Sequence, residues 1–364
     1  MRVLVVNAGS SSLKLSVVDE EHTVDAHTVE RWDGAGDLDP LRDYLDGVAS
    51  DGLDAVGHRV VHGGPRFREA VLLDDDAVAY LDSISDLAPL HNPRAVAAIR
   101  AVGRLLPDLP SVAAFDTAFH ATLSEAAATY ALPREWNHTF GLRRYGFHGL
   151  SHAHAVRRGA ELVGRSPDAL RIVSCHLGAG ASLCAVHDGR SVDTTMGFTP
   201  LAGLVMQTRV GSVDPGILLW LLEHGGVDVE TLGGVLEHQS GLKGLSGTSG
   251  DLRDVLEARA AGDHDAALAF DVYVHRLVRE VGSMAASAGG LDLLVFTGGM
   301  GEHSAVLRVA AASGLAHLGV EVDESVEVDG DTDLTLDGAR AHTVVVAAAE
   351  DLEVARETTR ALER

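Results

Sequence analysis

Two segments of this sequence, each an apolar run, a loop of small residues and a second run, recur 170 residues apart. Sliding the chain on itself by that distance aligns Val3 with Val173. The same shift brings loops 8–12 and 178–182 into register. Short apolar runs bounded by glycine are typical of buried strands. The alignment therefore predicts a duplicated strand–loop–strand unit that opens each half of the chain. A chance likeness of two glycine-rich loops is the alternative.

Strands and helices are expected to alternate along the whole chain. The apolar pattern predicts buried strands at 3–6, 170–173 and 293–296, and helices at 92–106, 152–163, 251–261 and 266–286. A further helix is expected from Ser304. This alternation favours an α/β fold. We expect two domains, because a single hydrophobic core stops growing at about 250 to 300 residues and this chain has 364, of which 46% are hydrophobic.

The charge and cysteine content exclude several classes of partner. The formal net charge is -24, with 29 Lys and Arg against 53 Asp and Glu, which disfavours binding to nucleic acid or to an anionic membrane. Cys175 and Cys184 are the only cysteines and form neither a metal motif nor a disulfide framework. No apolar run reaches the length of a membrane span, and the N-terminus has no signal-peptide pattern. We expect a cytoplasmic protein with no nucleic-acid or membrane partner.

Three glycine-rich loops follow predicted strands, and each is suited to hold phosphate. Glycine lets backbone N–H groups approach an anion closely, and the start of a helix favours negative charge. In the first loop, alternation places Leu13 and Leu15 on one face of the next strand and Lys14 on the other. Neither a Walker A motif nor a dinucleotide fingerprint is present. One such loop is equally a plain glycine–serine hairpin, but three favour nucleotide binding. The loops are 7–14, 176–182 and 297–302.

Eight short blocks of the sequence resemble, in order, the signature blocks of the acetokinase family. The first reads VLVVNAGSSSLKLS and the fifth YGFHGLSH. The blocks are 3–16, 57–64, 87–93, 115–120, 145–152, 193–203, 208–215 and 297–302.

The resemblance implies the fold of the actin, sugar-kinase and Hsp70 superfamily. That fold has two ribonuclease-H-like domains, each with a duplicated ββαβαβα-type core, around a central cleft. The expected N-terminal domain is 1–146 and the nucleotide-binding domain is 147–345. The helix in 346–364 is expected to pack back on the N-terminal domain.

The resemblance also implies a reaction and its cofactors. It implies Mg²⁺-dependent, reversible in-line phosphoryl transfer between ATP and acetate, giving acetyl phosphate and ADP, by a homodimer; Mn²⁺ can replace Mg²⁺. Alternatives within this fold are a propionate or other short-chain acyl acceptor, or pyrophosphate as donor. A non-catalytic, nucleotide-dependent switch is an alternative of another class.

Residue by residue, the resemblance assigns roles to positions of this chain. The implied catalytic residues are Arg59, Asp116, His148 and Arg209. The implied acetate-binding residues are Arg59 together with Val61, Leu90, Phe147 and Pro200. The implied metal-placing residues are Asn7 and Glu350. The implied nucleotide-binding residues are Ser10, Ser12, Lys14, His176, Leu177, Gly178, Ala179, Gly180, Asp251, Leu252, Arg253, Gly298, Gly299, Met300, Gly301 and Glu302.

The chemistry of a carboxylate acceptor refines the role of Asp116. A carboxylate is already ionised at neutral pH, so the acceptor needs no general base. We therefore expect Asp116 to fix an arginine or a Mg²⁺-bound water. Without the family blocks, Arg59 would be read as a surface cation, His148 as a packing residue and Glu350 as a solvated acid. His91 and His120 stay open as hydrogen-bonding support.

The sequence departs from the family pattern at three places. Ala179 stands where the family has Asn, which removes a side-chain donor and acceptor and predicts weaker or altered binding of the phosphate donor. An Ala179→Asn variant with an unchanged KM for ATP would contradict this. Ala348–Leu352 replaces the family's Thr-Asn-Glu-Glu-Leu around Glu350, and the stretch between Lys14 and Arg59 is shortened.

Overall fold

The computed structural model describes residues 1–9, 12–30, 32, 39–49 and 52–364, and these residues form two compact units. Unit 1 comprises Met1–Ala121, Phe147–His154 and Ala349–Arg364, and unit 2 comprises Thr122–Gly146 and Ala155–Ala348. The domain ranges expected from sequence place 122–146 in the first domain and 147–154 in the second. The compact units assign these two segments the other way round.

Unit 1 is built on one mixed β-sheet, sheet A, with strand order β3-β2-β1-β4-β6-β5. β1 is antiparallel to β2 and parallel to β4, and β4 is parallel to β6. The strands are β1 Arg2–Ala8, β2 Ser12–Asp19, β3 His22–Glu30, β4 Ala55–Val60, β5 Val71–Leu72 and β6 Ser111–Phe115.

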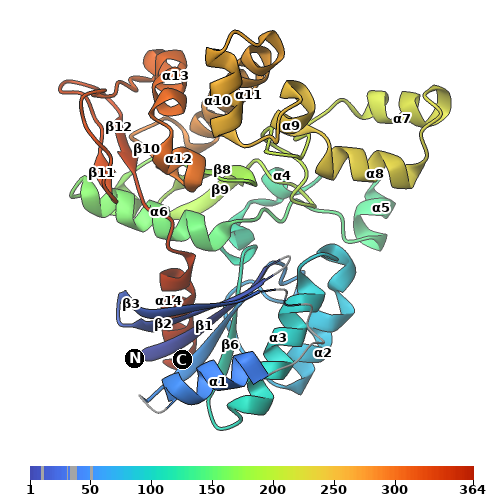
Figure 1. The fold of residues 1–364 in the computed structure, drawn as a ribbon, viewed down its shortest axis with the longest axis vertical. Helices are drawn as coiled ribbons and strands as arrows, with labels where there is room; N and C mark the ends of the chain where they lie inside the picture. Colours follow the sequence, from blue (N-terminus) through green and yellow to red (C-terminus); the bar gives the residue numbers. More distant parts are fainter. Residues whose placement is uncertain (10–11, 31, 33–38, 50–51) are drawn as a thin grey trace. The chain divides into compact units, whose positions relative to one another are not determined.

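Helices cover both faces of sheet A (Figure 1). On one face, α14 (Glu350–Leu362) packs with Val3 and Val5 through Val354. On the other face, α1 (Asp39–Ala49) and α3 (Asn92–Leu105) bury the opposite side chains of β1 and β2, among them Leu13 and Leu15. The predicted alternation along β2 is thus confirmed, and Lys14 is exposed.

Unit 2 repeats this architecture on sheet B, with strand order β11-β12-β10-β7-β8-β9. Its strands are β7 Ile172–Leu177, β8 Ala181–His187, β9 Arg190–Thr194, β10 Leu293–Thr297, β11 Thr332–Asp333 and β12 His342–Val345. α6 (Gly149–Leu162) packs closely on β10, since a Cβ on Gly159 would lie 2.9 Å from Val295. α11 (His264–Ala288) covers β7, β8 and β9 (Figure 1).

The remaining helices of the described residues are the following. α2 is Asp75–Ser83, α4 Glu125–Ala128, α5 Arg134–Thr139, α7 Pro215–His224, α8 Val229–His238, α9 Gly241–Ser246, α10 Leu252–Ala260, α12 Gly299–His303 and α13 Ala305–Leu315. The 3-10 helices of the described residues are η1 Ser85–Leu87, η2 Ala118–Thr122, η3 Pro167–Ala169 and η4 Ala316–Leu318. None of the described helices combines the length and the apolar character that a membrane span requires.

The two sheets have the same topology, which confirms the predicted duplication. In each, three antiparallel strands are followed by two parallel ones and a short antiparallel edge strand, in the same chain order. β1 therefore corresponds to β7, as the alignment of Val3 with Val173 predicts. The predicted strands and helices are present, with ends shifted by a few residues. The helix expected from Ser304 is α13, which Ser304 caps.

Candidate active site

A polar row crosses three neighbouring strands of sheet A. Asn7 on β1 pairs with Lys14 on β2 and with Arg59 on β4, so these side chains emerge at one level of the sheet. Directly paired residues point to the same face of a sheet. That face is the one covered by α14, because Val3 and Val5 alternate with Asn7 along β1 and pack against this helix.

Two carboxylates hold Arg59 from different elements of unit 1. Asp116 binds it in bidentate fashion, with Nε–Oδ1 at 3.0 Å and Nη2–Oδ2 at 2.7 Å. Glu350, the first residue of α14, lies 2.8 Å from Nη1. Planar two-point contacts of this kind fix the orientation of a guanidinium. The expectation that Asp116 fixes an arginine is therefore confirmed.

Burial shapes the ionisation of this group. The side chain of Asp116 is 2% exposed, and those of Arg59 and Glu350 are 19% and 20% exposed. Burial opposes the charge of Arg59, but the carboxylates of Asp116 and Glu350 outweigh it, so the pKa of Arg59 lies above its ordinary value. Burial raises the pKa of Glu350, against the opposing effect of the Arg59 guanidinium.

His148 stands immediately before α6 in a left-handed conformation, with a φ of 58°. The backbone N–H of the next residue, Gly149, donates to the Asp116 carbonyl at 2.8 Å. A Cβ on Gly149 would lie 2.2 Å from that oxygen, so only glycine permits the contact. The start of α6 therefore fixes His148 beside Asp116.

The loop after β4 is held by buried polar side chains. The fully buried Asn92 side chain accepts from the His62 N–H at 3.1 Å and donates to its carbonyl at 3.0 Å. Gly63 donates to the hydroxyl of Thr117, next to Asp116, at 3.2 Å. These contacts fix the backbone beside Val61.

The residues expected to bind the acetate methyl group differ in exposure. Val61 is half-buried, Leu90 is 51% exposed and Phe147 is 1% exposed. The Phe147 ring lies edge-on to His62, with 5.6 Å between centroids, and its carbonyl lies 3.1 Å from Nε2 of His120. His120 thus supports the position of Phe147. Pro200, the fourth expected residue, belongs to unit 2.

Only part of the first glycine-rich loop, 7–14, lies within the described residues. Ser10 lies outside the described residues. Gly9 donates its N–H to the Ser12 carbonyl at 2.8 Å, which closes the turn between β1 and β2. Arg94, near the start of α3, lies 3.4 Å from the Gly9 carbonyl. This arginine adds a cation near the loop that sequence reasoning missed.

In unit 2, the second and third glycine-rich loops leave neighbouring parallel strands at the same end of sheet B. Thr297 on β10 pairs with His176 on β7, so the loops that follow begin side by side. Gly298 has a φ of 78°, and a Cβ there would lie 3.0 Å from the Leu177 backbone. This glycine therefore lets the start of α12 lie directly against loop 176–180. Residues 299–302, which were expected to be part of a loop, belong to α12.

Gln207 connects these loops to the third predicted nucleotide segment. Its N–H donates to the Ala179 carbonyl at 3.2 Å, and its own carbonyl accepts from Lys243 at 3.0 Å. Gly250, with a φ of 84°, packs against the same Gln207 carbonyl. The predicted residues Asp251, Leu252 and Arg253 follow it and start α10, with Asp251 as the cap. Hydrogen bonds from Arg253 lower the pKa of Asp251 to about 2.

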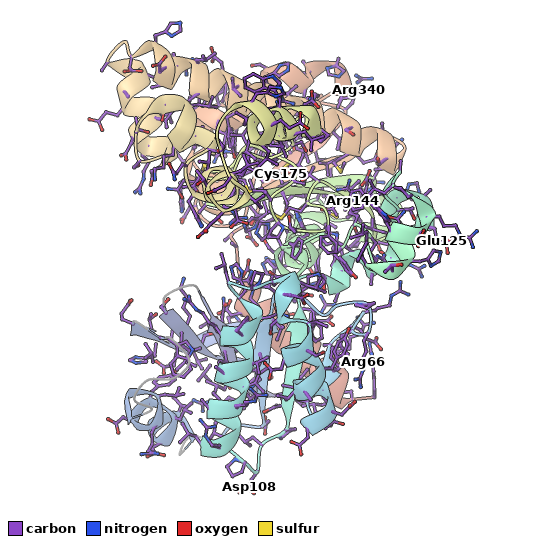
Figure 2. The ribbon with its side chains drawn as sticks, turned by 90° about the vertical axis from the view of Figure 1, so that its right-hand side faces the viewer. Arg66, Asp108, Glu125, Arg144, Cys175 and Arg340 are labelled. Carbon is purple, nitrogen blue, oxygen red and sulfur yellow. The ribbon has the colours of Figure 1, made fainter. Side chains whose placement is uncertain are left out.

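Arg209 of unit 2 is held by the segment that precedes it. Its Nη1 donates to the Pro200 carbonyl at 3.0 Å, and burial lowers its pKa. Arg144 (Figure 2) binds the carbonyls of Thr194, Thr195 and Met196 through one nitrogen, at 2.9, 3.2 and 3.0 Å. Arg144 therefore orders the backbone that leads toward Pro200.

Sequence similarity assigns the chain to a family. A sequence model of the acetokinase family matches residues 39–356. The chain belongs to the acetokinase family. Members of this family are phosphotransferases that use a carboxyl group as acceptor. The acetate kinase of Nostoc punctiforme is similar throughout, with 41% identity over 98% of each chain.

Solved structures of acetokinases agree with the fold described above. An acetate kinase from Porphyromonas gingivalis has a TM-score of 0.92 and 33% identity over 99% of both chains. A propionate kinase from Francisella tularensis has a TM-score of 0.89 and 35% identity over 98% of both chains. These similarities confirm the predicted fold class of two ribonuclease-H-like domains.

Several supporting residues of this acetokinase were missed at the level of sequence. Asn92 and Gly149 lie inside blocks that resemble the family, so a signal was present at 87–93 and 145–152. Thr117 lies within the block 115–120 for the same reason. Gln207 acts through its backbone, which leaves no side-chain signal to read.

Proposed function

We propose that this acetokinase transfers the γ-phosphoryl group of ATP reversibly to acetate, giving acetyl phosphate and ADP. The observation that supports this most strongly is the Arg59 guanidinium, fixed by Asp116 and Glu350 in a row with Asn7 and Lys14. A cation preorganised in this way can reduce the repulsion between two anionic reactants, a carboxylate and a polyphosphate.

The proposed reaction is direct and in line. A carboxylate oxygen of acetate attacks the γ-phosphorus, the bond from phosphorus to the bridging oxygen breaks, and ADP leaves with the electron pair. No proton is transferred, because the acceptor is ionised. Arg59, Arg209 and His148 would stabilise the oxygens of the transferred group, and Asp116 would keep Arg59 oriented.

The glycine-rich loops of unit 2 would hold the nucleotide. The remaining backbone N–H groups of these segments, 176–180 and 298–302, suit phosphate oxygens, and both segments leave the same end of sheet B; the N–H groups of Gly178 and Glu302 are already bonded to carbonyls within their own segments. Asp251, Leu252 and Arg253 would contact the same nucleotide, since Gln207 connects their loop to Ala179. In unit 1, Lys14 and the Ser12 hydroxyl would contact the phosphate groups of the nucleotide.

Asn7 and Glu350 fit a magnesium ion by their chemistry. Both offer oxygen ligands, and the described residues include no cluster of three or more His, Cys, Asp or Glu side chains suited to a metal. Mg²⁺ keeps several waters and usually takes one or two carboxylates besides the substrate phosphates, so a sparse set of protein ligands is suitable. When bound, the ion would neutralise charge on the phosphate oxygens.

The acceptor test uses hydroxylamine, which converts acyl phosphates to hydroxamates. We expect the protein with Mg-ATP to form hydroxamate fastest with acetate, more slowly with propionate and much more slowly with butyrate. A faster rate with propionate would favour the second candidate, a propionate kinase, which the similarity to the Francisella enzyme supports. Absence of hydroxamate with every short acid would contradict the kinase proposal. ATP formation from acetyl phosphate and ADP tests reversibility, and pyrophosphate in place of ATP tests the donor.

A further inference from the structure

A pocket of unit 2, of about 390 Å³, lies between α13, the end of α10 and the segment 322–334. Its walls are largely apolar and include Val309, Val322 and Leu334. Arg259 lies over the ring of Phe270, with 4.5 Å from Cζ to the centroid. The volume is that of a small-molecule site, since such sites span about 300 to 1,000 Å³.

Arg308 on α13 also lines this pocket, although it is only 5% exposed. Its Nη1 donates to the carbonyls of Gly301 and Glu302, at 2.8 and 2.7 Å. Nε and Nη2 make no hydrogen bond to another described residue, and they are not among the fully buried polar atoms, so they reach the solvent. Buried arginines are almost always paired with an anion, so this guanidinium lacks its usual partner.

The carboxylates that line the pocket do not supply that partner. Asp323 accepts from the N–H and hydroxyl of Ser325, at 2.9 and 2.6 Å, and Glu324 is its neighbour on the same turn. Burial lowers the pKa of Arg308, and no carboxylate offsets this effect. The other cation that lines the pocket is Arg259 on α10, which lies 4.0 Å from Asp271. Arg308 therefore forms no ion pair with a described carboxylate.

We propose that this pocket binds a small organic anion larger than acetate. Its oxyanion head would accept from Nε and Nη2 of Arg308, and its apolar body would pack on Val309, Val322 and Leu334. The two free nitrogens of this guanidinium suit an oxyanion, and the apolar walls suit a short alkyl or aryl chain.

The contacts of Arg308 also connect this pocket to the loop-and-helix segment 298–302, which includes most of α12. The same guanidinium holds the carbonyls of Gly301 and Glu302, while the Glu302 carboxylate accepts from the Ala348 N–H at 3.0 Å. An anion on Arg308 therefore changes the support of that loop and with it the affinity for ATP. This coupling rests on the proposed nucleotide role of the loop, whereas binding of the anion does not. Coupling of binding sites is reciprocal, so ADP must change the affinity for the anion by the same factor.

Calorimetry on the full chain tests binding with hexanoate, hexyl phosphate and 1-hexanol. We expect an oxyanion to bind and hexanol not to; the ratio of the hexanoate and hexyl phosphate affinities then identifies the head group. Ala310→Phe adds a ring at the wall of the pocket and keeps Arg308, and Ser313→Phe adds the same ring at an exposed position of α13. Binding should weaken at least tenfold in Ala310→Phe and in Arg308→Met, and stay unchanged in Ser313→Phe.

The outcomes separate this site from the acetate site and from the proposed function. Equal hexanoate affinity in Ala310→Phe and Ser313→Phe, both checked for folding by thermal unfolding, would place the anion elsewhere and overturn the proposal. So would the absence of binding to the wild-type chain. A KM for ATP that hexanoate leaves unchanged, despite binding, would refute the coupling. Hexanoate binding without any hydroxamate formation would refute the proposed function alone.

Discussion

Arg59 is a single residue whose orientation is set by two carboxylates. Its strand places it in the row with Asn7 and Lys14, while Asp116 and Glu350 hold two sides of its guanidinium. Each carboxylate comes from a different element, so the direction of the guanidinium depends on the packing of unit 1. Both side-chain oxygens of Asp116, which is 2% exposed, contact Arg59. This contact supports a positioning role for Asp116.

We predict that Asp116→Asn lowers kcat by about 10² to 10³, because a misoriented Arg59 stabilises the transferred group poorly. The pH profile of the residual activity should keep the wild-type shape between pH 6 and 9, since no proton is transferred by Asp116. Steady-state kinetics with Mg-ATP across this range provide the measurement. Loss of one limb of the profile in the variant would instead identify Asp116 as an acid or base.

His58 makes a separate contribution, to stability. It is 1% exposed on β4, between residues that face α3, and neither ring nitrogen has a hydrogen-bond partner among the described residues. Burial lowers its pKa from 6.5 to about 3. Below pH 6.5 the His58 imidazole is protonated in the unfolded chain but stays neutral in the folded chain. The free energy of unfolding therefore falls as the pH drops from 6.5 toward 3.

We predict that His58→Leu removes this part of the acid sensitivity. Each pH unit within the window corresponds to about 1.4 kcal/mol, so the wild type should lose about 2 kcal/mol more than the variant between pH 7 and pH 5. Urea unfolding at both pH values measures the difference, and His62→Leu serves as a comparison because burial also lowers the pKa of His62, to about 4. Parallel pH dependence of the wild type and His58→Leu would contradict the assignment.

Among the elements, strands with glycine-rich exits were predictable and helix starts were less so. The residues of β1, β7 and β10 are mostly apolar and buried, so short apolar runs in the sequence predicted these strands. α6 was expected at 152 but begins at Gly149, because its first turn is fixed by the Asp116 carbonyl, a contact distant in sequence. The ion pair of Glu350 with Arg59 was also invisible in the pattern, since it depends on where α14 docks.

We predict that Gly149→Ala damages catalysis through the start of α6. The added Cβ would meet the Asp116 carbonyl at 2.2 Å, so α6 and Asp116 must move apart and His148 moves with them. We expect kcat to fall about 10- to 100-fold with little change in the KM for ATP, as misplacement of about 1 Å can cost this much. Gly103→Ala, in α3 with open space around it, is the control and should keep kcat and gain about 0.5 to 1 kcal/mol of stability. Wild-type kcat in Gly149→Ala would show that the contact is dispensable.

At the scale of the whole molecule, the duplication explains why each half carries a glycine-rich loop at the same place. The exits of β1 and β7 are equivalent positions of equivalent sheets. Their chemistry has diverged: the first is followed by Lys14 on β2, whereas the second has Ala179 and relies on backbone groups. The duplication was readable from two aligned loops, whereas its divergence in function depends on neighbours such as Gln207 that the alignment does not include.

Apolar side chains of helix α7 in unit 2 are exposed. α7 reads PGILLWLLEH, none of its residues is buried, and Ile217, Leu219 and Trp220 are 49%, 62% and 58% exposed. A helix that is apolar on all sides is normally covered, and a large exposed apolar patch marks an interaction site. We propose a second copy of the chain as the partner, in keeping with the homodimer expected of this family.

We predict that the wild-type protein has twice the mass of one chain by light scattering after size exclusion, and that Leu219→Glu with Trp220→Glu makes it a monomer. Two carboxylates in an apolar contact are costly to desolvate, so the dimer should weaken by orders of magnitude. Trp136→Glu is the matched control, because Trp136 on α5 is 53% exposed and would lie outside the interface. A dimer that survives the double substitution but dissociates in Trp136→Glu would move the interface to α5, and a monomeric wild type would exclude the homodimer.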